Sequence, residues 1–317
     1  MKKIFITRKL AGRGEALLKE KGFTVVVFEK DCPVSRTRLL KEAADADALI
    51  TLLTDKIDRE VINALNKCRV IANCAVGFNN IDVNYARNKN IIVTNTPDIL
   101  TDATADLTLA LILACARRLR EGELMMRADK FKSWKPQLLL GLEMSGKTVG
   151  IIGAGRIGSA AAKRLIPFGT KIIYYDRNKR ENFENEFGAK KVSLNTLLKT
   201  ADIVSIHIPL SDGTFHLLNK DNLALMKKSS ILVNTSRGEI IEEKFLIRMM
   251  KAKKIFAAGL DVYEGEPEIN PDLLKLQNVF LLPHIGSATV ETRSGMAELC
   301  ARNVIAVLTG KKAITPV

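Results

Sequence analysis

Three glycines in the middle of the chain, Gly153, Gly155 and Gly158, stand between an apolar run at residues 148–152 and a helical pattern. A second apolar run follows the helix and ends in Asp176. A strand, a tight glycine turn and a helix N-terminus present backbone N–H groups that can bind phosphate, and a carboxylate after the next strand can accept hydrogen bonds from ribose hydroxyls. The pattern therefore predicts a dinucleotide site. The alternative is a structural turn of the same shape that binds nothing.

Asp176 also bears on which dinucleotide binds. Its negative charge would repel a 2′-phosphate, which favours NAD over NADP. Arg177 follows it directly and could offset part of that repulsion. The sequence therefore predicts NAD as the coenzyme and leaves NADP possible.

Reduction of a carbonyl with such a coenzyme needs a proton donor and a positive group that holds the substrate. Of the three histidines, His284 follows an apolar strand run most directly, where the carboxyl end of a strand is expected. Arg237 follows another such run, and its planar guanidinium matches a carboxylate bidentately. Glu266, in an acid-rich turn, could stabilise a protonated histidine. Taken singly, each has a plain alternative: a structural histidine, a surface ion pair and a solvated turn residue.

Strand and helix patterns alternate along the chain, and they must position these residues. Strands are expected at residues 3–7, 23–28, 48–53, 70–76, 91–95, 148–152, 172–175, 203–208, 231–234, 255–260 and 279–282. Helices are expected at residues 10–21, 36–44, 59–66, 156–168, 242–253 and 289–308. This alternation predicts parallel sheets with helices on both faces and ligands at the carboxyl ends of the strands.

We therefore expect an α/β fold with two doubly wound parallel-sheet domains. Residues 1–98 and 287–317 would form a substrate domain, and residues 99–286 a dinucleotide-binding domain. Residues 101–126 predict one long helix that is apolar on most faces, which indicates burial within one subunit or between two. The irregular stretch 127–146 contains Trp134, which we interpret as a packing anchor.

Composition excludes several other classes of protein. The chain has 317 residues and a net charge of +14, but its lysines and arginines are scattered in pairs and only 5% of residues are aromatic, so no nucleic-acid platform is expected. No apolar stretch approaches the ~20 residues of a membrane-spanning helix, and the N-terminal apolar run is too short for a signal peptide. The five cysteines show no zinc spacing, so we expect no metal site and a reducing, cytoplasmic setting.

The chain resembles the D-isomer-specific 2-hydroxyacid dehydrogenase family over essentially its whole length. The motifs that match are Val76-Gly77, Asn80-Ile81-Asp82, NTPDILTDATAD (95–106), GIIGAGRIG (150–158), NTSRGE (234–239), GLDVYEGEP (259–267) and LPHIGSAT (282–289). The resemblance implies a Rossmann coenzyme domain and a flavodoxin-like substrate domain. It also implies a homodimer with the long helix at residues 101–126 in the interface.

The resemblance assigns catalytic and substrate-binding roles to single residues. It implies that Arg237 binds the substrate carboxylate and keto oxygen, that Glu266 supports the histidine and that His284 is the acid/base. It places the amides of Val76 and Gly77 on the carboxylate, and the side chains of Leu52 and Leu53 beside the substrate's small side chain.

A larger set of residues is expected to bind the coenzyme. Within it, Asp261 and the turn at Thr235 and Ser236 are implied to lie against the nicotinamide. The whole set comprises Thr104, Gly153, Ala154, Gly155, Arg156, Ile157, Gly158, Asp176, Arg177, His207, Pro209, Thr214, Thr235, Ser236, Asp261 and Gly286.

Residues 50–58 and 95–106 are most similar to the glyoxylate/hydroxypyruvate reductases of the family. The expected reaction is the NAD(P)H-dependent reduction of glyoxylate or hydroxypyruvate to glycolate or D-glycerate. Two alternatives stay open: a reductase of a larger 2-oxo acid such as 2-ketogluconate, and a non-catalytic NAD-sensing binding protein.

Overall fold

The computed structural model describes all 317 residues, and the chain divides into two compact units. Unit 1 comprises Met1–Leu100 together with Ser287–Val317, and unit 2 comprises Thr101–Gly286. None of the helices combines the length and the apolar character that a bilayer-spanning segment requires.

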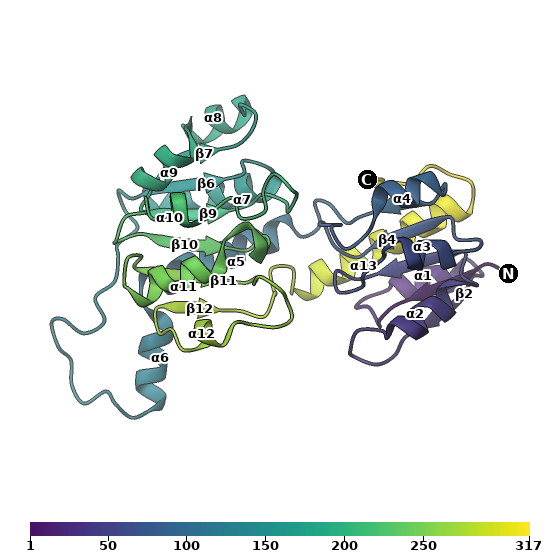
Figure 1. The fold of residues 1–317 in the computed structure, drawn as a ribbon, viewed down its shortest axis with the longest axis horizontal. Helices are drawn as coiled ribbons and strands as arrows, with labels where there is room; N and C mark the ends of the chain where they lie inside the picture. Colours follow the sequence, from purple (N-terminus) through teal and green to yellow (C-terminus); the bar gives the residue numbers. More distant parts are fainter. The chain divides into compact units, whose positions relative to one another are not determined.

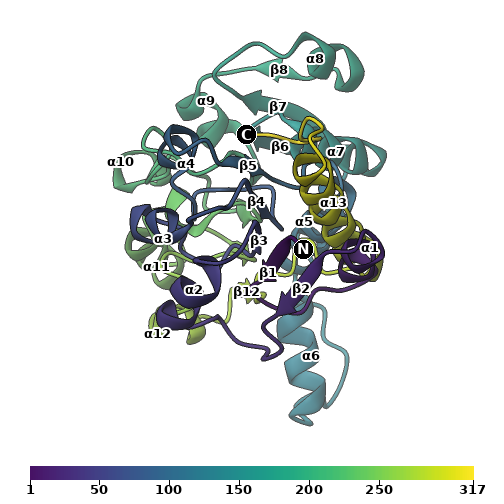
Figure 2. The ribbon, with the colours of Figure 1, turned by 90° about the vertical axis from the view of Figure 1, so that its right-hand side faces the viewer.

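A five-stranded parallel sheet with the order β2–β1–β3–β4–β5 forms the centre of unit 1. Its strands are β1 (Lys3–Ile6), β2 (Thr24–Val27), β3 (Ala48–Thr51), β4 (Val70–Asn73) and β5 (Ile92–Thr94). Helices α1 (Gly14–Glu20) and α13 (Val290–Leu308) pack together on one face, and α2 (Arg36–Ala43), α3 (Arg59–Ala64) and α4 (Val83–Asn88) lie on the other (Figure 2). This is the flavodoxin-type order of a doubly wound sheet.

Both ends of the chain contribute to unit 1. Helix α13 packs on α1, β3 and β4, and Thr289 caps its N-terminus by accepting a hydrogen bond from the Thr292 amide. The tail after this helix runs along the free edge of β5, where the Val317 amide donates to the Val93 carbonyl at 3.0 Å. The C-terminal segment thereby covers an otherwise open strand edge.

Unit 2 contains a seven-stranded parallel sheet with the order β12–β11–β10–β9–β6–β7–β8 (Figure 1). Its strands are β6 (Thr148–Ile152), β7 (Lys171–Tyr175), β8 (Lys190–Lys191), β9 (Ile203–Ile206), β10 (Ile231–Asn234), β11 (Ala257–Leu260) and β12 (Val279–Leu281). The order reverses at β6, the strand that enters the glycine turn, as in a Rossmann sheet. The predicted α/β fold with two doubly wound parallel sheets is confirmed.

Two hydrophobic clusters hold this sheet between layers of helices. One cluster includes Ile112 and Leu165 of α5 (Thr101–Ala116) and α7 (Arg156–Leu165), and the other includes Leu197 and Leu246 of α9 (Leu194–Thr200) and α11 (Glu243–Lys251). The remaining short helices are α8 (Glu181–Phe187), α10 (Lys220–Leu223), α12 (Pro271–Leu274) and the 3-10 turns η1 (Ile166–Phe168) and η2 (Gly238–Ile240). Strands buried on both faces explain the continuous apolar runs in the sequence.

The prediction of one helix over residues 101–126 is wrong, because the helix breaks after Ala116. Helix α6 (Leu119–Arg127) starts anew behind Arg118, whose φ of 52° is left-handed. The Arg118 guanidinium donates to the Glu121 carboxylate at 2.6 and 2.8 Å. The Leu142 amide donates to the Ala116 carbonyl at 2.8 Å. Contacts made by the break itself therefore replace the helical hydrogen bonds.

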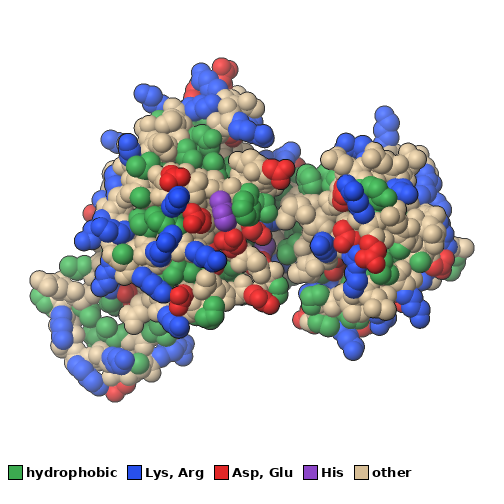
Figure 3. Space-filling view, in the orientation of Figure 1, with side chains coloured by type: hydrophobic (Ala, Val, Ile, Leu, Met, Phe, Trp, Pro, Cys, Tyr) green, Lys and Arg blue, Asp and Glu red, His purple; other side chains and the backbone are tan.

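Helix α6 and the loop behind it extend away from the sheet of unit 2 (Figure 1). Apolar side chains remain exposed along this segment, and Trp134 is 77% exposed, so it is not the packing anchor that we expected within the chain. The exposed members are Leu119, Leu124, Met126, Phe131, Trp134 and Leu140. Green side chains are visible on this part in the space-filling view (Figure 3).

Candidate active site

The glycine turn has the geometry that close approach of backbone requires. Gly153 has a φ of 97°, and a Cβ on Gly158 would lie 2.1 Å from the Gly153 carbonyl oxygen, so only glycine lets strand and helix meet here. At Gly155, by contrast, a Cβ would meet nothing within 4 Å. Gly155 is also the N-cap of α7, and no side chain caps that helix. The first turn of α7 therefore presents N–H groups to open space, which fits a phosphate.

Asp176 stands directly after β7, as predicted, and turns back to the glycine loop. Its Oδ2 accepts the Ala154 amide at 3.2 Å, and its Oδ1 accepts the Asn178 amide at 3.1 Å. Arg180 forms an ion pair with this carboxylate: its Nε lies 3.2 Å from Oδ2 and its Nη2 lies 3.4 Å from Oδ1. The sequence pointed to Arg177 as the cation that could offset this charge, and in the structure the ion pair at Asp176 is made by Arg180.

His284 and Glu266 lie together. His284 Nδ1 is 2.7 Å from Glu266 Oε2, and the other carboxylate oxygen accepts the Tyr263 amide at 2.8 Å. Burial alone would raise the pKa of Glu266. The hydrogen bond and charge of His284, the Tyr263 amide and the charge of Arg237 outweigh burial, so the pKa is lowered. Glu266 is thus held as a carboxylate against the imidazole, which leaves Nε2 as the nitrogen able to face a substrate.

Asp261 holds the backbone on which His284 stands. Its two carboxylate oxygens accept the Ile285 and Gly286 amides, each at 2.7 Å. His284 itself has a φ of 56°, a left-handed conformation that a non-glycine residue keeps only when its surroundings impose it. Burial raises the pKa of Asp261, opposed by these two amides and the charge of His284. Asp261, expected beside the nicotinamide, therefore has its charge directed at the His284 loop.

The turn that carries Arg237 is held by Asn234, which was not among the predicted site residues. The buried Asn234 side chain accepts the Ser236 amide at 3.0 Å and donates to the Arg237 carbonyl at 2.8 Å. A Cβ at Gly238 would lie 1.9 Å from the Tyr263 backbone, so glycine brings this turn against the loop that carries Glu266. Burial lowers the pKa of Arg237, and the charges of Glu266 and Glu239 oppose that shift.

The other two histidines have different surroundings. His207 follows β9, its Nε2 lies 2.9 Å from Ser205 Oγ, and burial lowers its pKa to about 4, so its ring is neutral at physiological pH. His216 Nε2 lies 3.0 Å from Glu264 Oε1, and its ring stacks on Phe215. The chain thus has a second histidine–glutamate pair, which the sequence did not predict.

Further predicted coenzyme residues occupy loops at the carboxyl ends of the same strands. Thr104 on α5 donates to the Gly286 carbonyl at 3.2 Å, and Thr235 lies 2.9 Å from the Thr108 hydroxyl. Ser236 donates to the Ile208 carbonyl, and Thr214 donates to the Pro209 carbonyl at 2.7 Å. Unit 2 thereby gathers Arg237, Glu266 and His284 with Thr104, Thr235, Ser236, Asp261 and Gly286 through a network of contacts. Their roles toward a coenzyme stay predictions.

In unit 1, the predicted substrate residues lie on two loops after β3 and β4. The strands end earlier than predicted, so Leu52, Leu53, Val76 and Gly77 lie in loops. Polar side chains, of which Asp55 and Asn73 are buried, shape these loops. The Leu52 amide donates to Asp55 at 2.8 Å, Asn73 donates to the Gly77 carbonyl at 2.9 Å, and Asn80 and Asn95 donate to the carbonyls of Leu52 and Val76.

Asp55, Asn73, Asn80 and Asn95 were not predicted as site residues. Burial raises the pKa of Asp55, opposed by hydrogen bonds from Thr7 and Leu52. The signal in the sequence was polar residues placed at the ends of apolar strands, where no polar group is needed for packing.

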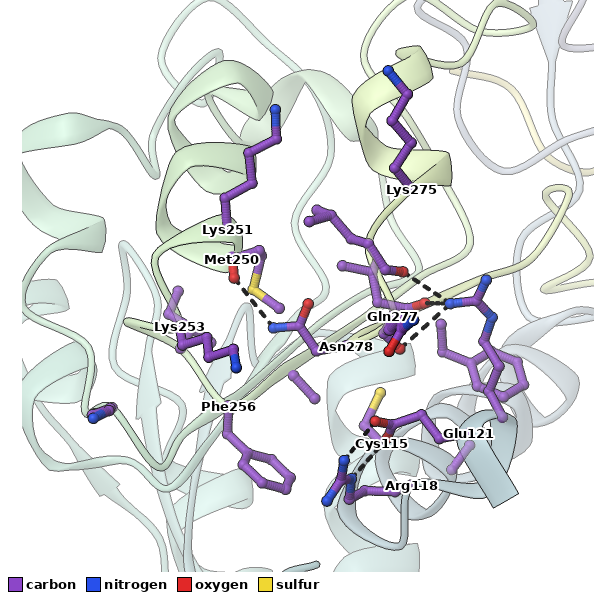
Figure 4. Close-up of a pocket in the computed structure, with 18 residues that line it drawn as sticks. Cys115, Arg118, Glu121, Met250, Lys251, Lys253, Phe256, Lys275, Gln277 and Asn278 are labelled. Carbon is purple, nitrogen blue, oxygen red and sulfur yellow. Dashed lines mark hydrogen bonds and ion pairs between the residues drawn. The ribbon is translucent and has the colours of Figure 1, made fainter. Parts of the chain in front are cut away.

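A hollow of about 540 Å³ lies at the amino ends of the strands in unit 2, beside the starts of β11 and β12 (Figure 4). Its lining is basic, but most of the cations are engaged: Arg118 pairs with Glu121, and Arg120 donates to the Leu276 and Val279 carbonyls. No histidine lines it, and nowhere in the chain do His, Cys, Asp or Glu side chains gather into a possible metal site.

Together these residues can bind an anionic substrate and give it a proton. Arg237 supplies positive charge, and the His284–Glu266 pair supplies an imidazole that a carboxylate keeps in one orientation. The glycine turn and Asp176 fit the phosphates and a ribose of a dinucleotide.

Comparison with known proteins identifies relatives of this chain. The family model described as D-isomer specific 2-hydroxyacid dehydrogenase, NAD binding domain, matches residues 109–286. A glyoxylate reductase of Thermococcus litoralis is 47% identical over 313 residues, which cover 98% of this chain and 94% of that protein.

Solved structures agree with this relationship. The TT0316 protein of Thermus thermophilus superposes with a TM-score of 0.94 at 41% identity, over 99% of each chain. An NADPH-dependent glyoxylate/hydroxypyruvate reductase of Sinorhizobium meliloti, in complex with NADP and malonate, has a TM-score of 0.86 at 31% identity, over 100% of this chain and 96% of that one.

Proposed function

Because this chain belongs to the D-isomer specific 2-hydroxyacid dehydrogenase family, a family of NAD(P)-dependent enzymes, we propose that it reduces short 2-oxo acids. The substrates proposed are glyoxylate and hydroxypyruvate, and the products are glycolate and D-glycerate. The names of the relatives in Thermococcus litoralis and Sinorhizobium meliloti support this choice.

One observation carries the proposal: a histidine paired with a carboxylate lies near a half-buried arginine. His284 Nδ1 is 2.7 Å from Glu266 Oε2, and the charge of Arg237 contributes to lowering the pKa of Glu266. A 2-oxo acid presents a carboxylate and a carbonyl oxygen on adjacent carbons, which is the pair of groups that a guanidinium and an imidazolium can bind together.

The proposed mechanism divides the work among these side chains. The reduced coenzyme, when bound, supplies a hydride to the carbonyl carbon. Arg237 binds the substrate carboxylate and polarises the carbonyl oxygen. His284 gives its Nε2 proton to that oxygen, and the neutral imidazole that remains keeps its Nδ1–H on Glu266. Proton and hydride together convert the carbonyl group of the 2-oxo acid to the hydroxyl group of the 2-hydroxy acid.

For unit 1, the substrate-binding roles of Leu52, Leu53, Val76 and Gly77 remain part of the proposal. Leucine side chains are bulky and offer no hydrogen bond. They therefore suit a 2-oxo acid whose substituent on the carbonyl carbon, besides the carboxylate, is small. Exchange of Leu53 for alanine is expected to favour larger 2-oxo acids, measured as the ratio of kcat/KM for 2-ketogluconate and glyoxylate.

A steady-state assay tests the proposal. Oxidation of NADH and NADPH is followed with glyoxylate, hydroxypyruvate, pyruvate and 2-ketogluconate. Turnover that is fastest with glyoxylate or hydroxypyruvate supports it. Preference for 2-ketogluconate supports the reductase of larger acids. Tight NADH binding without turnover of any acid would contradict the proposal and favour the NAD-sensing protein.

We also propose that the chain forms a homodimer through α6 and the loop behind it. The segment exposes Leu124, Met126, Phe131 and Trp134 far more than a monomer surface commonly does. Light scattering on a size-exclusion column at micromolar concentration is expected to give twice the chain mass of 35.0 kDa. A mass of one chain would contradict it.

A reducing compartment such as the cytoplasm is the setting that we infer. All five cysteines are free thiols, and four of them are buried.

A further inference from the structure

Donors within the chain engage both oxygens of the Asp176 carboxylate. Each of its oxygens accepts one backbone amide, from Ala154 and Asn178, and one N–H of the Arg180 guanidinium. An ionised carboxylate offers about four lone-pair positions, so none is left for the two hydroxyls of a ribose.

Of these four donors, only the guanidinium can leave. The Ala154 and Asn178 amides belong to the glycine turn and to the loop after β7, and they cannot move without moving the backbone. The Asp176 side chain is 12% exposed, whereas that of Arg180 is 46% exposed and can rotate into solvent. A ribose diol therefore competes with Arg180 for Asp176.

The released guanidinium would find an open space beside it. A hollow of about 420 Å³ is lined by Ala154, Ser159, Lys179 and Arg180. Lys179 is held by Glu184 at 3.4 Å and by Glu181 at 3.8 Å, so it is already paired. Asp176 is the only acidic side chain that pairs with Arg180, and a single rotation would free this cation for another anion.

We propose that Arg180 governs the coenzyme choice of this chain. Bound to Asp176, it weakens the hold of that carboxylate on the ribose diol of NAD(H), and rotated away from Asp176, its guanidinium binds the 2′-phosphate of NADP(H). The same side chain thus strengthens the binding of NADP(H) and weakens the binding of NAD(H). The inference rests on the proposed function only in requiring that the coenzyme binds.

Binding of two redox-inactive fragments tests the inference without turnover. Calorimetric titration of the full chain with ADP-ribose and with its 2′-phosphate gives two dissociation constants, and their ratio isolates the 2′-phosphate. Arg180→Gln is expected to weaken binding of the phosphorylated fragment roughly 10- to 100-fold, the range for a hydrogen bond between charged groups. Binding of ADP-ribose itself is expected to stay equal or become tighter.

Arg248→Gln is the matched control. Arg248 is exposed on α11, lies over the Phe245 ring and is not among the predicted coenzyme-binding residues. Its removal changes the net charge by the same amount and is expected to shift the ratio of the two dissociation constants by less than about threefold, a purely long-range effect. Arg180→Lys, which keeps the charge without the planar fork, is expected to lie between wild type and Arg180→Gln.

Two results would overturn the inference alone: a ratio in Arg180→Gln within threefold of wild type, or an equal shift in Arg248→Gln. Failure of the wild-type chain to bind either fragment would overturn the coenzyme site as well. Misfolding is not expected to obscure the result, because the structural contact of Arg180 is its amide, which donates to the Tyr174 hydroxyl at 2.9 Å.

Discussion

Two histidine–glutamate pairs in unit 2 are alike by several measures. His284 lies 2.7 Å from Glu266, and His216 lies 3.0 Å from Glu264. The four side chains are between 26% and 33% exposed. Both histidines have a left-handed backbone, with φ of 56° at His284 and 48° at His216. Contact distance, exposure and backbone strain therefore do not distinguish a catalytic pair from a structural one.

The neighbours of each pair make the difference. Beside His284 and Glu266 lie the half-buried Arg237 and the carboxylate of Asp261, which holds the histidine loop. Glu264 instead faces a second carboxylate: its amide donates to Glu243 at 3.2 Å, and the Glu243 amide donates back to it at 3.3 Å. Burial, together with the charge of Glu264, raises the pKa of Glu243. A histidine–glutamate pair becomes useful for acid–base chemistry through a nearby positive group that holds a substrate.

Exchange of His284 for glutamine is expected to have the largest effect on the first pair. Loss of the general acid should lower kcat for 2-oxo acid reduction at least roughly 100-fold, since a glutamine side chain cannot transfer a proton. Steady-state rates measure the loss, and NADH titration shows whether coenzyme binding survives. A loss of less than about tenfold would remove His284 from the role of proton donor.

Arg237→Lys is expected to have the next largest effect. An ammonium keeps the charge but loses the planar fork, so KM should rise and kcat should fall, together lowering kcat/KM roughly 10- to 100-fold. Arg248→Lys is the matched control, because that arginine is exposed on α11 and lies over the Phe245 ring. Equal kinetics in the two variants would show that Arg237 does not hold the substrate.

Glu266→Gln should change the pH dependence of the reaction more than its maximum rate. The pKa of Glu266 is lowered by His284, so the carboxylate is charged throughout the neutral range and stabilises the protonated imidazole. A glutamine amide carries no charge and does not titrate. In wild type, kcat/KM should fall as the pH drops through the lowered pKa of Glu266 and its charge is lost, and this fall should be absent from the variant, measured from about pH 3 to 8. In Glu264→Gln, the profile should not move.

The sequence predicted the edge of the sheet on which these groups lie. Residues that follow the strands of a parallel sheet must share one edge, so Arg237, Glu266 and His284 could be expected near each other without knowledge of a single contact. The sequence could not show which glutamate pairs with which histidine. Glu264 and Glu266 lie in the same acid-rich turn, and the two imidazole rings reach them from different loops.

The break in the long helix could not be predicted either, because it involves a contact between distant residues. The apolar helical pattern runs unbroken through Arg118, but at the break the Leu142 amide donates to the Ala116 carbonyl. Adjacency in sequence pointed to Arg177 as the cation beside Asp176, but the ion pair is made by Arg180, four residues along the chain. Strand order follows from local pattern, whereas such contacts require the folded backbone.

His216→Gln is expected to have the smallest effect, and it sharpens the comparison most. The His216 ring joins its loop to Glu264 and stacks on Phe215 at 4.0 Å, and none of these groups touches the His284 pair. Loss of one half-exposed pair should lower the free energy of unfolding by about 1 kcal/mol or less, which corresponds to roughly 2 °C in Tm. The kcat should stay within about twofold of wild type, because the proton donor and Arg237 are unchanged. Thermal unfolding and steady-state rates measured on the same sample decide the matter: a loss of activity comparable to that of His284→Gln would mean that the second pair, too, takes part in the reaction.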